Sequence, residues 1–240
     1  MGSDNSRLRI NLGVLRERVE RACEKSARPR SSVRLIAITK THPVETIQEI
    51  IDLGVNDIGE NRVREIEAKI PLLRGDFTVH MVGHLQTNKV AQLIPHVKWI
   101  QSIDREKLIS RIEFCHKETS KLRALVEVNT SKEAAKSGCM PQECRALCER
   151  VAATKAMEFC GLMTIGPLNG SEREVRESFS SLRRLSETCC DLAPAMELSM
   201  GMSGDFEWAI EEGATMIRVG TALFGERICD DTQKKECVCI

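Results

Sequence analysis

The chain has 240 residues, of which 42% are hydrophobic and 29% are charged, and 35 basic side chains balance 35 acidic ones. This composition is typical of a globular protein and excludes an intrinsically disordered chain. The zero net charge argues against a protein that coats nucleic acid or an anionic membrane, and no stretch reaches the ~18 apolar residues of a membrane span.

Helical and strand patterns alternate from the start of the chain. The segment Asn5–Ala27 predicts a helix, because Leu8, Leu12, Leu15 and Val19 share one face. Short apolar, β-branched runs then recur with helical patterns between them, which predicts parallel strands in an α/β fold. The predicted strands are Val33–Thr39, Val55–Ile58, Thr78–Val82, Val97–Gln101, Ala124–Val128, Phe159–Met163, Met196–Ser199 and Thr215–Val219.

Eight such units in this length predict a (β/α)8 TIM barrel with an extra N-terminal helix, and an open doubly wound sheet is the alternative. Capping signals support the helices between the strands. Ser171 followed by Glu174 is a capping-box pattern, and Asp104 directly precedes a helical pattern over Arg105–Lys117. We find no linker, so we predict a single domain over residues 1–240.

The two ends of the chain carry weaker signals. We expect residues 8–227 to be structured and the polar tail 228–240 to fray. Gly2 lies in a myristoylation pattern and Cys237 in an approximate prenylation box, but both motifs are short and the second is a poor match. We therefore expect no membrane anchor. No basic segment followed by an apolar run opens the chain, so we also expect no signal peptide and a cytoplasmic location.

The chain contains 11 cysteines and no tyrosine. The cysteines are odd in number and scattered, so we interpret them as reduced thiols. The closest group, Cys139, Cys144 and Cys148, lacks the CxxC pairs of a structural zinc site and has no histidine nearby. We therefore predict no metal site.

The first predicted strand ends in Ala-Ile-Thr-Lys, which places Lys40 behind an apolar run. In a (β/α)8 barrel the functional site lies at the C-terminal ends of the strands. Desolvation there disfavours the ammonium form, and imine formation needs a neutral amine. Taken alone, Lys40 fits better a surface lysine whose stem lies along apolar surface.

The ends of the seventh and eighth strands are rich in glycine and hydroxyl side chains. Residues 198–205 read Leu-Ser-Met-Gly-Met-Ser-Gly-Asp, and residues 218–221 read Arg-Val-Gly-Thr. Ser203 is placed to cap the next helix, and the glycines let N–H groups approach an anion. Each loop alone is typical of a turn. Together with Lys40, at the usual phosphate site of such barrels, they predict a phosphorylated carbonyl compound held as an imine, with pyridoxal 5′-phosphate as leading candidate.

Seven ordered motifs support this interpretation by a resemblance that covers Leu8 to Arg227. They are Ala37–Thr41, Gly59–Asn61, His80–Lys89, Ser137–Gly138, Gly161–Met163, Leu198–Ser203 and Arg218–Gly225. In this combination the chain resembles the pyridoxal phosphate homeostasis protein family. The resemblance implies a barrel similar to the N-terminal domain of alanine racemase, and a role in vitamin B6 and amino-acid balance without an established reaction.

The resemblance also implies the cofactor site. Its members would be Lys40, Asn61, Ser199, Ser203, Arg218, Gly220 and Thr221. In this family the lysine carries the cofactor; Ser203, Gly220 and Thr221 would contact the phosphate, with Ser199 a weaker candidate. Arg218 would face the pyridine nitrogen, and Asn61 could touch the ring or its hydroxyl.

Two residues depart from the family pattern and leave the detail of the pocket wall open. Arg62 stands where the family often has an aromatic residue, and His84 stands where it often has proline. His84 could donate a proton at the barrel mouth, but a partly exposed loop histidine is at least as good an interpretation. We interpret His80, inside the third strand, as a core histidine.

The predicted site favours a carrier over an enzyme. A cation at the pyridine nitrogen disfavours ring protonation and makes the ring a poor electron sink. Racemisation needs a base on each face of Cα, and only Lys40 can be named. We expect a monomeric carrier that exchanges pyridoxal phosphate with dependent apoenzymes and binds small amino acids. The alternatives are a pyridoxal-phosphate-dependent racemase and a phosphate-sugar isomerase or aldolase that uses Lys40.

Overall fold

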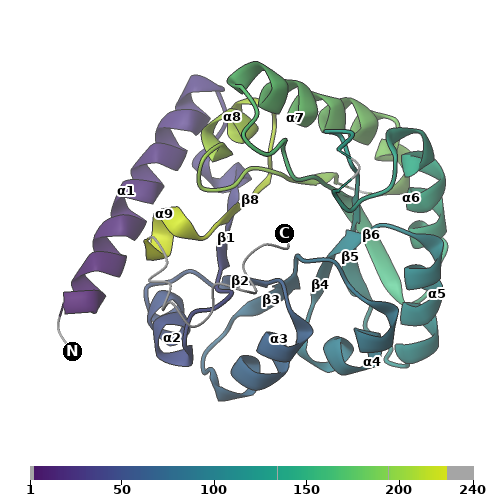
Figure 1. Ribbon diagram of the computed structural model, residues 1–240, viewed down its shortest axis with the longest axis horizontal. Helices are drawn as coiled ribbons and strands as arrows, with labels where there is room; N and C mark the ends of the chain where they lie inside the picture. The colour runs from purple at the N-terminus through teal and green to yellow at the C-terminus, as the bar shows by residue number, and fades with distance from the viewer. Residues whose placement is uncertain (1–2, 134, 194, 226–240) are drawn as a thin grey trace.

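Eight parallel strands form a closed barrel in the computed structural model, which describes residues 3–133, 135–193 and 195–225 (Figure 1). Each strand pairs with the next along the chain, and the first pairs with the last, with Ala37 opposite Val219. The strands are β1 (Arg34–Ile38), β2 (Asp57–Glu60), β3 (Thr78–Met81), β4 (Trp99–Ile103), β5 (Leu122–Glu127), β6 (Met157–Met163), β7 (Glu197–Ser199) and β8 (Met216–Val219). The predicted (β/α)8 barrel is confirmed, and the open-sheet alternative is wrong.

Amphipathic helices surround the barrel. They are α1 (Ser3–Lys25), α2 (Val44–Asp52), α3 (Val63–Lys69), α4 (Val90–Leu93), α5 (Glu106–Cys115), α6 (Cys144–Ala152), α7 (Glu172–Glu187), α8 (Phe206–Glu211) and α9 (Thr221–Phe224). The capping box at the start of α7 is confirmed, because the Ser171 hydroxyl accepts from the Glu174 N–H. The cap predicted for α5 is wrong: Arg105 is the N-cap residue, and the Asp104 carboxylate pairs with Arg105 and His84 instead.

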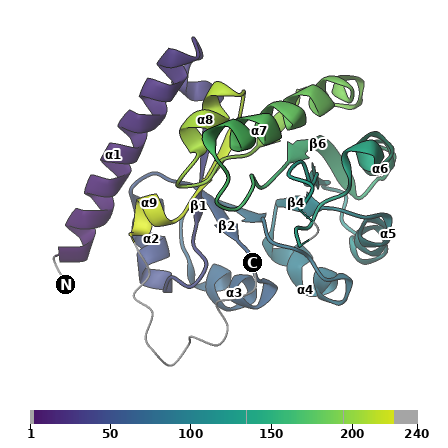
Figure 2. The same ribbon diagram turned by 45° about the horizontal axis from the view of Figure 1, so that its top comes forward.

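The N-terminal helix α1 lies beside α8 and α9 on the outside of the barrel, in both views (Figures 1 and 2). Its predicted apolar face is buried, with Leu12 and Leu15 at most 3% exposed. Polar contacts fix the packing as well: Asn11 donates to the Leu223 carbonyl at 2.9 Å, and Arg18 forms a bidentate pair with Glu207 at 3.1 and 2.9 Å. This extra helix thus supports the segment that follows β8.

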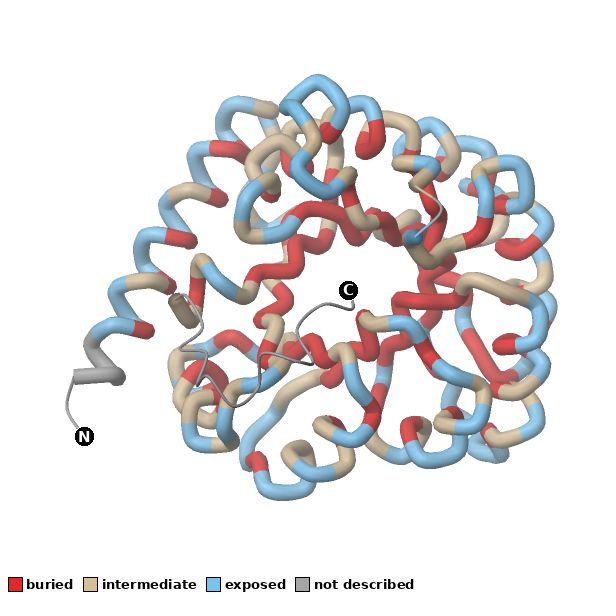
Figure 3. The backbone as a smooth tube through the Cα atoms, in the orientation of Figure 1, coloured by how far each residue is buried: buried red, intermediate tan, exposed pale blue. Residues whose placement is uncertain are grey.

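Buried residues follow the strands around the ring (Figure 3). The larger apolar layer lies between the strands and the helices. A smaller apolar group fills the inside of the barrel, and it consists of Ile36, Trp99, Leu125, Cys160, Met163 and Met216. The barrel is therefore a packed core with an open rim at the strand ends, as expected of this fold.

Two strands lie about two residues further along than their apolar runs predict. β2 extends through Gly59 to Glu60, and β4 ends at Ile103 rather than Gln101. Each extension contains a polar side chain that is fully buried, Glu60 in β2 and Ser102 in β4. The Glu60 carboxylate has partners in Thr39 and Lys69, whereas the Ser102 hydroxyl has none among the described residues. Hydropathy alone does not mark such residues as strand, because polar side chains are usually exposed.

A glycine permits the irregularity in β6. The register between β5 and β6 shifts after Ala124, next to Gly161, whose φ is +147°. A Cβ at Gly161 would lie 2.0 Å from the Glu197 carbonyl oxygen. Only glycine accepts both this φ and the close approach of β7.

No helix among the described residues is long and apolar enough to cross a membrane. Gly2 and Cys237, the residues that the two lipidation motifs would modify, lie outside the described residues, as does the tail 228–240.

Candidate functional site

Closure of the barrel brings four strand ends side by side in the order β7, β8, β1 and β2. Ser199 is the last residue of β7, and Arg218 lies one residue before the end of β8. Lys40 follows the end of β1 by two residues, and Asn61 directly follows β2. The residues that the sequence predicts therefore share one side of the barrel mouth.

The residues on either side of Lys40 each donate a hydrogen bond to a carboxylate. The Thr39 hydroxyl donates to Glu60 at 2.7 Å, and the Thr41 N–H donates to Glu65 at 2.7 Å. Thr41 has φ +68°, which is unfavourable for a β-branched residue and requires support from its surroundings. These contacts fix the position of the Lys40 backbone at the barrel rim.

Lys69 joins these two carboxylates into one cluster. Its ammonium lies 3.1 Å from Glu60, 2.5 Å from Glu65 and 3.2 Å from the Thr39 carbonyl. Burial raises the pKa of Glu60, although Lys69 and the Thr39 hydroxyl act in the opposite direction. The cluster thus places a paired cation and two acids behind the loop of Lys40, where they stabilise its backbone.

The loops after β7 and β8 are joined by one hydrogen bond. The Ala222 N–H, at the start of α9, donates to the Ser203 hydroxyl at 3.1 Å. The prediction that Ser203 caps α8 is wrong, because the N-cap residue of α8 is Asp205 and Ser203 reaches α9 instead. Gly220 lies against Ile38 of β1, with its Cβ position 3.5 Å from the Ile38 carbonyl oxygen. Serine, glycine and the first turn of α9 thus gather next to β1.

A ring contact brings the Lys40 loop to the same place. His42, in that loop, lies 4.3 Å from the Phe224 ring in α9, measured between ring centroids. Thr221 begins α9, and its side chain is exposed. The amine of Lys40 and the hydroxyl of Thr221 therefore belong to two segments that are in contact.

Arg218 is a buried cation just inside the mouth, with 5% of its surface exposed. Nη1 donates to the Ser199 hydroxyl at 2.7 Å, and Nη2 donates to the Thr164 carbonyl at 2.8 Å. Burial lowers the pKa of Arg218 to about 10, although Asp205 and Glu127 raise it, so the guanidinium stays charged at neutral pH. It has five N–H groups, and these bonds use two of them.

Two residues at the mouth are missing from the predicted site. Thr164 supplies a carbonyl to Arg218, and Glu127 ends β5 with 4% exposure and a carboxylate oxygen that has no hydrogen-bond partner among the described residues. Burial and the neighbouring Asp104 raise the pKa of Glu127 to about 7, although Arg218 lowers it. An acid inside the apolar run Ala124–Val128 was the available signal for Glu127.

His84 is a partly exposed loop residue and His80 is a core residue, as the sequence analysis allows for each. His84 has 48% of its side chain exposed, and its Nδ1 lies 3.1 Å from Asp104 and 3.4 Å from the Ser137 hydroxyl. His80 is fully buried inside the barrel, and its Nε2 lies 2.8 Å from Asp57. His80 is thus a core histidine with a carboxylate partner.

A thiol cluster lies away from the mouth, around α6. The sulfur atoms of Cys144, Cys148 and Cys189 all lie within 4.8 Å of one another, and the first two are 3.9 Å apart. The described cysteines are free thiols. Hydrogen bonding to Cys144, together with burial, raises the pKa of Cys148 and of Cys139. That the cluster holds no metal stays a prediction.

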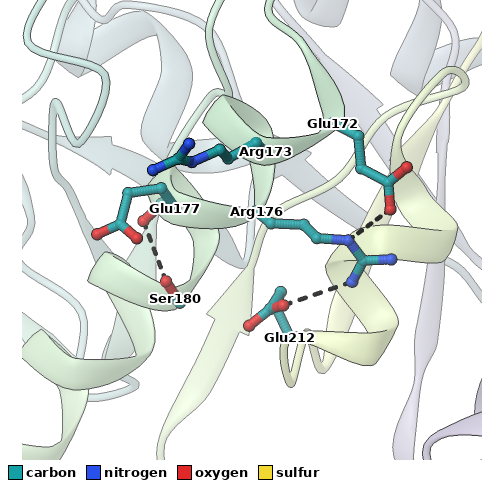
Figure 4. A pocket seen from close by; sticks show the side chains of 6 residues that line it. All are labelled: Glu172, Arg173, Arg176, Glu177, Ser180 and Glu212. Carbon is teal, nitrogen blue, oxygen red and sulfur yellow. Dashed lines mark hydrogen bonds and ion pairs between the residues drawn. The ribbon is translucent and has the colours of Figure 1, made fainter.

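A surface hollow between α7 and α8 is distinct from the mouth (Figure 4). Arg176 pairs with three acids, since it lies 2.7 Å from Glu172, 2.6 Å from Glu211 and 3.4 Å from Glu212. Arg173 has no ion-pair partner among the described residues. The hollow thus consists mainly of surface ion pairs around Arg176.

The groups at the mouth suit one kind of ligand. An amine can bond an aldehyde, hydroxyl and N–H donors near Gly220 can bind a phosphate, and a buried guanidinium that uses two of its five N–H groups on described residues can donate to a ring nitrogen. Pyridoxal 5′-phosphate has all three features, so the residues present fit this cofactor.

Comparison with known proteins defines the class first. The family model of the alanine racemase N-terminal domain matches residues 10–228. Alanine racemase of Corynebacterium glutamicum, at 13% identity and a TM-score of 0.70 over 95% of this chain and 62% of its own, shows the same fold. The chain is therefore a barrel of the alanine racemase N-terminal type.

More similar relatives narrow the assignment. The pyridoxal phosphate homeostasis proteins of Aquifex aeolicus and Vibrio cholerae are 41% and 39% identical, over 88% and 90% of this chain and 94% and 95% of theirs. PipY of Synechococcus elongatus, solved with PLP bound, is 35% identical with a TM-score of 0.74, over 87% of this chain and all of its own. The chain belongs to the pyridoxal phosphate homeostasis protein family.

Proposed function

We propose that this protein binds pyridoxal 5′-phosphate through Lys40 and carries or buffers it in vitamin B6 and amino-acid homeostasis, without turnover of its own. The observation that carries the proposal is the juxtaposition of Lys40 with the joined loops of Ser203 and Thr221, beside the buried cation of Arg218. The names of the relatives and the cofactor in PipY support it.

Each residue has a definite task in this proposal. Pyridoxal phosphate supplies an aldehyde that takes up and releases amines. Lys40 would hold that aldehyde as an imine, with release of water, and Asn61 at the adjacent strand end would contact the ring or its hydroxyl. Ser203, Gly220 and Thr221 bind the phosphate with hydroxyl and N–H groups. Arg218 donates a hydrogen bond to the ring nitrogen, which a fixed cation keeps unprotonated.

The charge on Arg218 is the reason to expect no turnover. An unprotonated ring withdraws electrons weakly, so a proton on Cα of a bound amino acid stays in place. The sequence has no tyrosine to act as a base. The alternative, a racemase, is favoured by one observation: Glu127, with a pKa of about 7, lies at the same mouth as an additional candidate base besides His84.

Exchange of the Cα hydrogen separates the two functions. In deuterium oxide with pyridoxal phosphate, L-alanine and L-serine are expected to keep their Cα hydrogen over hours, as mass spectrometry or proton NMR can follow. Rapid exchange that disappears in Lys40→Ala would contradict the carrier and establish an enzyme. Loss of such exchange in Glu127→Gln or in His84→Gln would then identify its second base.

The phosphate loops yield a second expected result. Thr221→Val removes one hydroxyl from a charged ligand, and such hydrogen bonds contribute about 1.5–3 kcal/mol. The dissociation constant for pyridoxal phosphate, measured by fluorescence or absorbance titration, should rise roughly tenfold to a hundredfold. Thr119→Val, at an exposed position between α5 and β5, is the matched control. Unchanged affinity in both Thr221→Val and Ser203→Ala would place the phosphate elsewhere.

The proposal extends to the setting of the protein. It acts as a cytoplasmic monomer that passes pyridoxal phosphate to dependent apoenzymes and meets small amino acids at its open mouth. The balanced charge and the many cysteines support this setting.

A further inference from the structure

A line of polar side chains crosses the inside of the barrel and ends at Arg218. The Arg218 Nη1 lies 2.7 Å from the Ser199 hydroxyl, which lies 2.7 Å from Gln101 Oε1. On the other side, Gln101 Nε2 lies 3.0 Å from His80 Nδ1, and His80 Nε2 lies 2.8 Å from Asp57 Oδ1. The three middle members are fully buried. The line joins β8 and β7 to β4, β3 and β2 across the interior.

The chemistry of its two ends gives this line one direction. A guanidinium can only donate, so the Ser199 hydroxyl accepts from Arg218 and donates its own proton to Gln101. The Gln101 amide then presents its NH₂ group to His80, whose Nδ1 must be the bare nitrogen. The His80 proton sits on Nε2 and is donated to the Asp57 carboxylate. Burial lowers the pKa of His80, which agrees with a neutral ring.

The reverse orientation of Gln101 is less favourable. It would turn the amide oxygen toward His80 and require a proton on both ring nitrogens, which places a cation in the interior. It would also leave the Ser199 hydroxyl proton without the Gln101 acceptor. The amide nitrogen additionally lies 3.7 Å from the Met216 sulfur, a weak acceptor that suits an N–H group.

The side chains around this line are apolar. Burying polar groups among them costs free energy, so packing alone does not explain why they are there. The His80 ring stacks on Trp99 at 5.4 Å between centroids, and Leu125, Met163 and Met216 belong to the same interior layer. Well-packed apolar side chains stabilise an interior at least as well as a buried polar network. A fully satisfied network instead fixes the position of the groups it ends on.

Charged groups stand at both ends of the line. They are Arg34, Asp57 and Glu197 near His80, and Glu127 and Asp205 near Arg218. Arg34 lies 4.0 Å from Asp57, so the accepting carboxylate at the lower end has a cationic partner.

We propose that Asp57, His80, Gln101 and Ser199 form a directional hydrogen-bond chain that sets the orientation of the Arg218 guanidinium toward the ring nitrogen of the bound cofactor. His80 and Gln101 are then positioning residues, which act through Ser199 without touching the cofactor. Ser199 belongs to this chain rather than to the phosphate site. The inference rests on the proposed function for the role of Arg218, but the chain itself is a property of the protein alone.

The first test needs no cofactor. Nitrogen-15 NMR of the full chain, labelled at histidine, is expected to show His80 as a neutral ring with its proton on Nε2. Comparison with a His80→Gln variant assigns the signal. A doubly protonated ring at neutral pH, or a proton on Nδ1, would contradict the direction of the chain.

The second test uses pyridoxal phosphate and its absorbance. In Ser199→Ala and Gln101→Met, borohydride should still attach the cofactor to Lys40, but the ring nitrogen should protonate at higher pH. A released Arg218 no longer opposes that proton, and we expect the absorbance titration to move up by about one pH unit. The double variant should move no further than either single one, because both break the same chain.

Matched controls separate positioning from stability. Ser199→Thr keeps the hydroxyl and should restore the wild-type titration. Ser178→Ala removes a buried hydroxyl that lies 2.6 Å from Thr130, outside the chain, and should leave the titration unchanged. Urea unfolding of each variant shows how much stability it has lost.

The outcomes are distinct. Shifts in Ser199→Ala and Gln101→Met, absent from Ser178→Ala, would support the chain. If both variants lost stability but titrated as wild type does, the hydrogen-bond chain would have a structural role only, and the proposal would be overturned. A wild-type protein that binds no pyridoxal phosphate would instead contradict the proposed function, and the positioning role would fall with it, whatever the state of His80.

Discussion

Replacement of Lys40 by alanine is expected to abolish the imine absorbance of bound pyridoxal phosphate completely. The loops of Ser203 and Thr221 are expected to stay in place in this variant, since the hydrogen bond from the Ala222 N–H to the Ser203 hydroxyl joins them to each other. The variant should therefore still bind the cofactor, weakly and as the free aldehyde. Absorbance spectra and equilibrium dialysis measure the two properties separately.

Lys132→Ala is the appropriate control, because Lys132 is an exposed lysine in the loop after β5, at the same end of the barrel. It should leave the imine absorbance unchanged. If the imine absorbance persisted in Lys40→Ala, or disappeared in Lys132→Ala, the assignment of the covalent bond to Lys40 would be wrong.

The second large effect concerns Glu127 and the pH dependence of stability. Burial, with Asp104 nearby, raises the pKa of this carboxyl from 4.5 to about 7 in the folded state. The folded protein thus holds a proton that the unfolded chain releases. Its stabilising contribution is fully present below pH 4.5 and is lost as the pH rises through 7. At about 1.4 kcal/mol per pH unit, the difference amounts to roughly 3 kcal/mol.

Glu127→Gln keeps the shape of the protonated acid and cannot ionise. We expect the variant to match wild type in unfolding free energy at pH 4 and to exceed it by roughly 3 kcal/mol at pH 8.5, as urea denaturation at the two values measures. Glu158→Gln, at a half-exposed position on β6, should change neither value. An equal difference at both pH values would show that Glu127 titrates normally.

The sequence predicts the barrel well because the evidence for it is spread over eight strand–helix units. Apolar runs recur in each unit, and small errors in any one of them do not change the topology. The errors occur where strands contain polar residues with internal partners, such as Glu60 with Thr39 and Lys69. Hydropathy is a property of one residue, whereas the burial of such groups depends on residues brought close by the fold.

The predicted site is limited in the same way. Lys40, Ser203 and Thr221 stand at strand ends and in short motifs, so order along the chain was enough to select them. The sequence predicts that Ser203 caps the nearby helix α8, but its hydroxyl accepts from the Ala222 N–H in the loop after β8. That contact joins two loops, so it cannot be inferred from the residues next to Ser203. The hydrogen-bond partners of Arg218 could not be predicted from the sequence, because the chain through Gln101 joins strands on different sides of the barrel.

The central claim is that Lys40 holds pyridoxal phosphate covalently at this mouth. Its most direct test is borohydride reduction of the wild-type protein with the cofactor, followed by proteolysis and mass spectrometry of every lysine-containing peptide. We predict one stable adduct of reduced pyridoxal phosphate, on the peptide that contains Lys40, and loss of the imine absorbance on reduction. An adduct confined to any other lysine, or no adduct at all, would contradict the account.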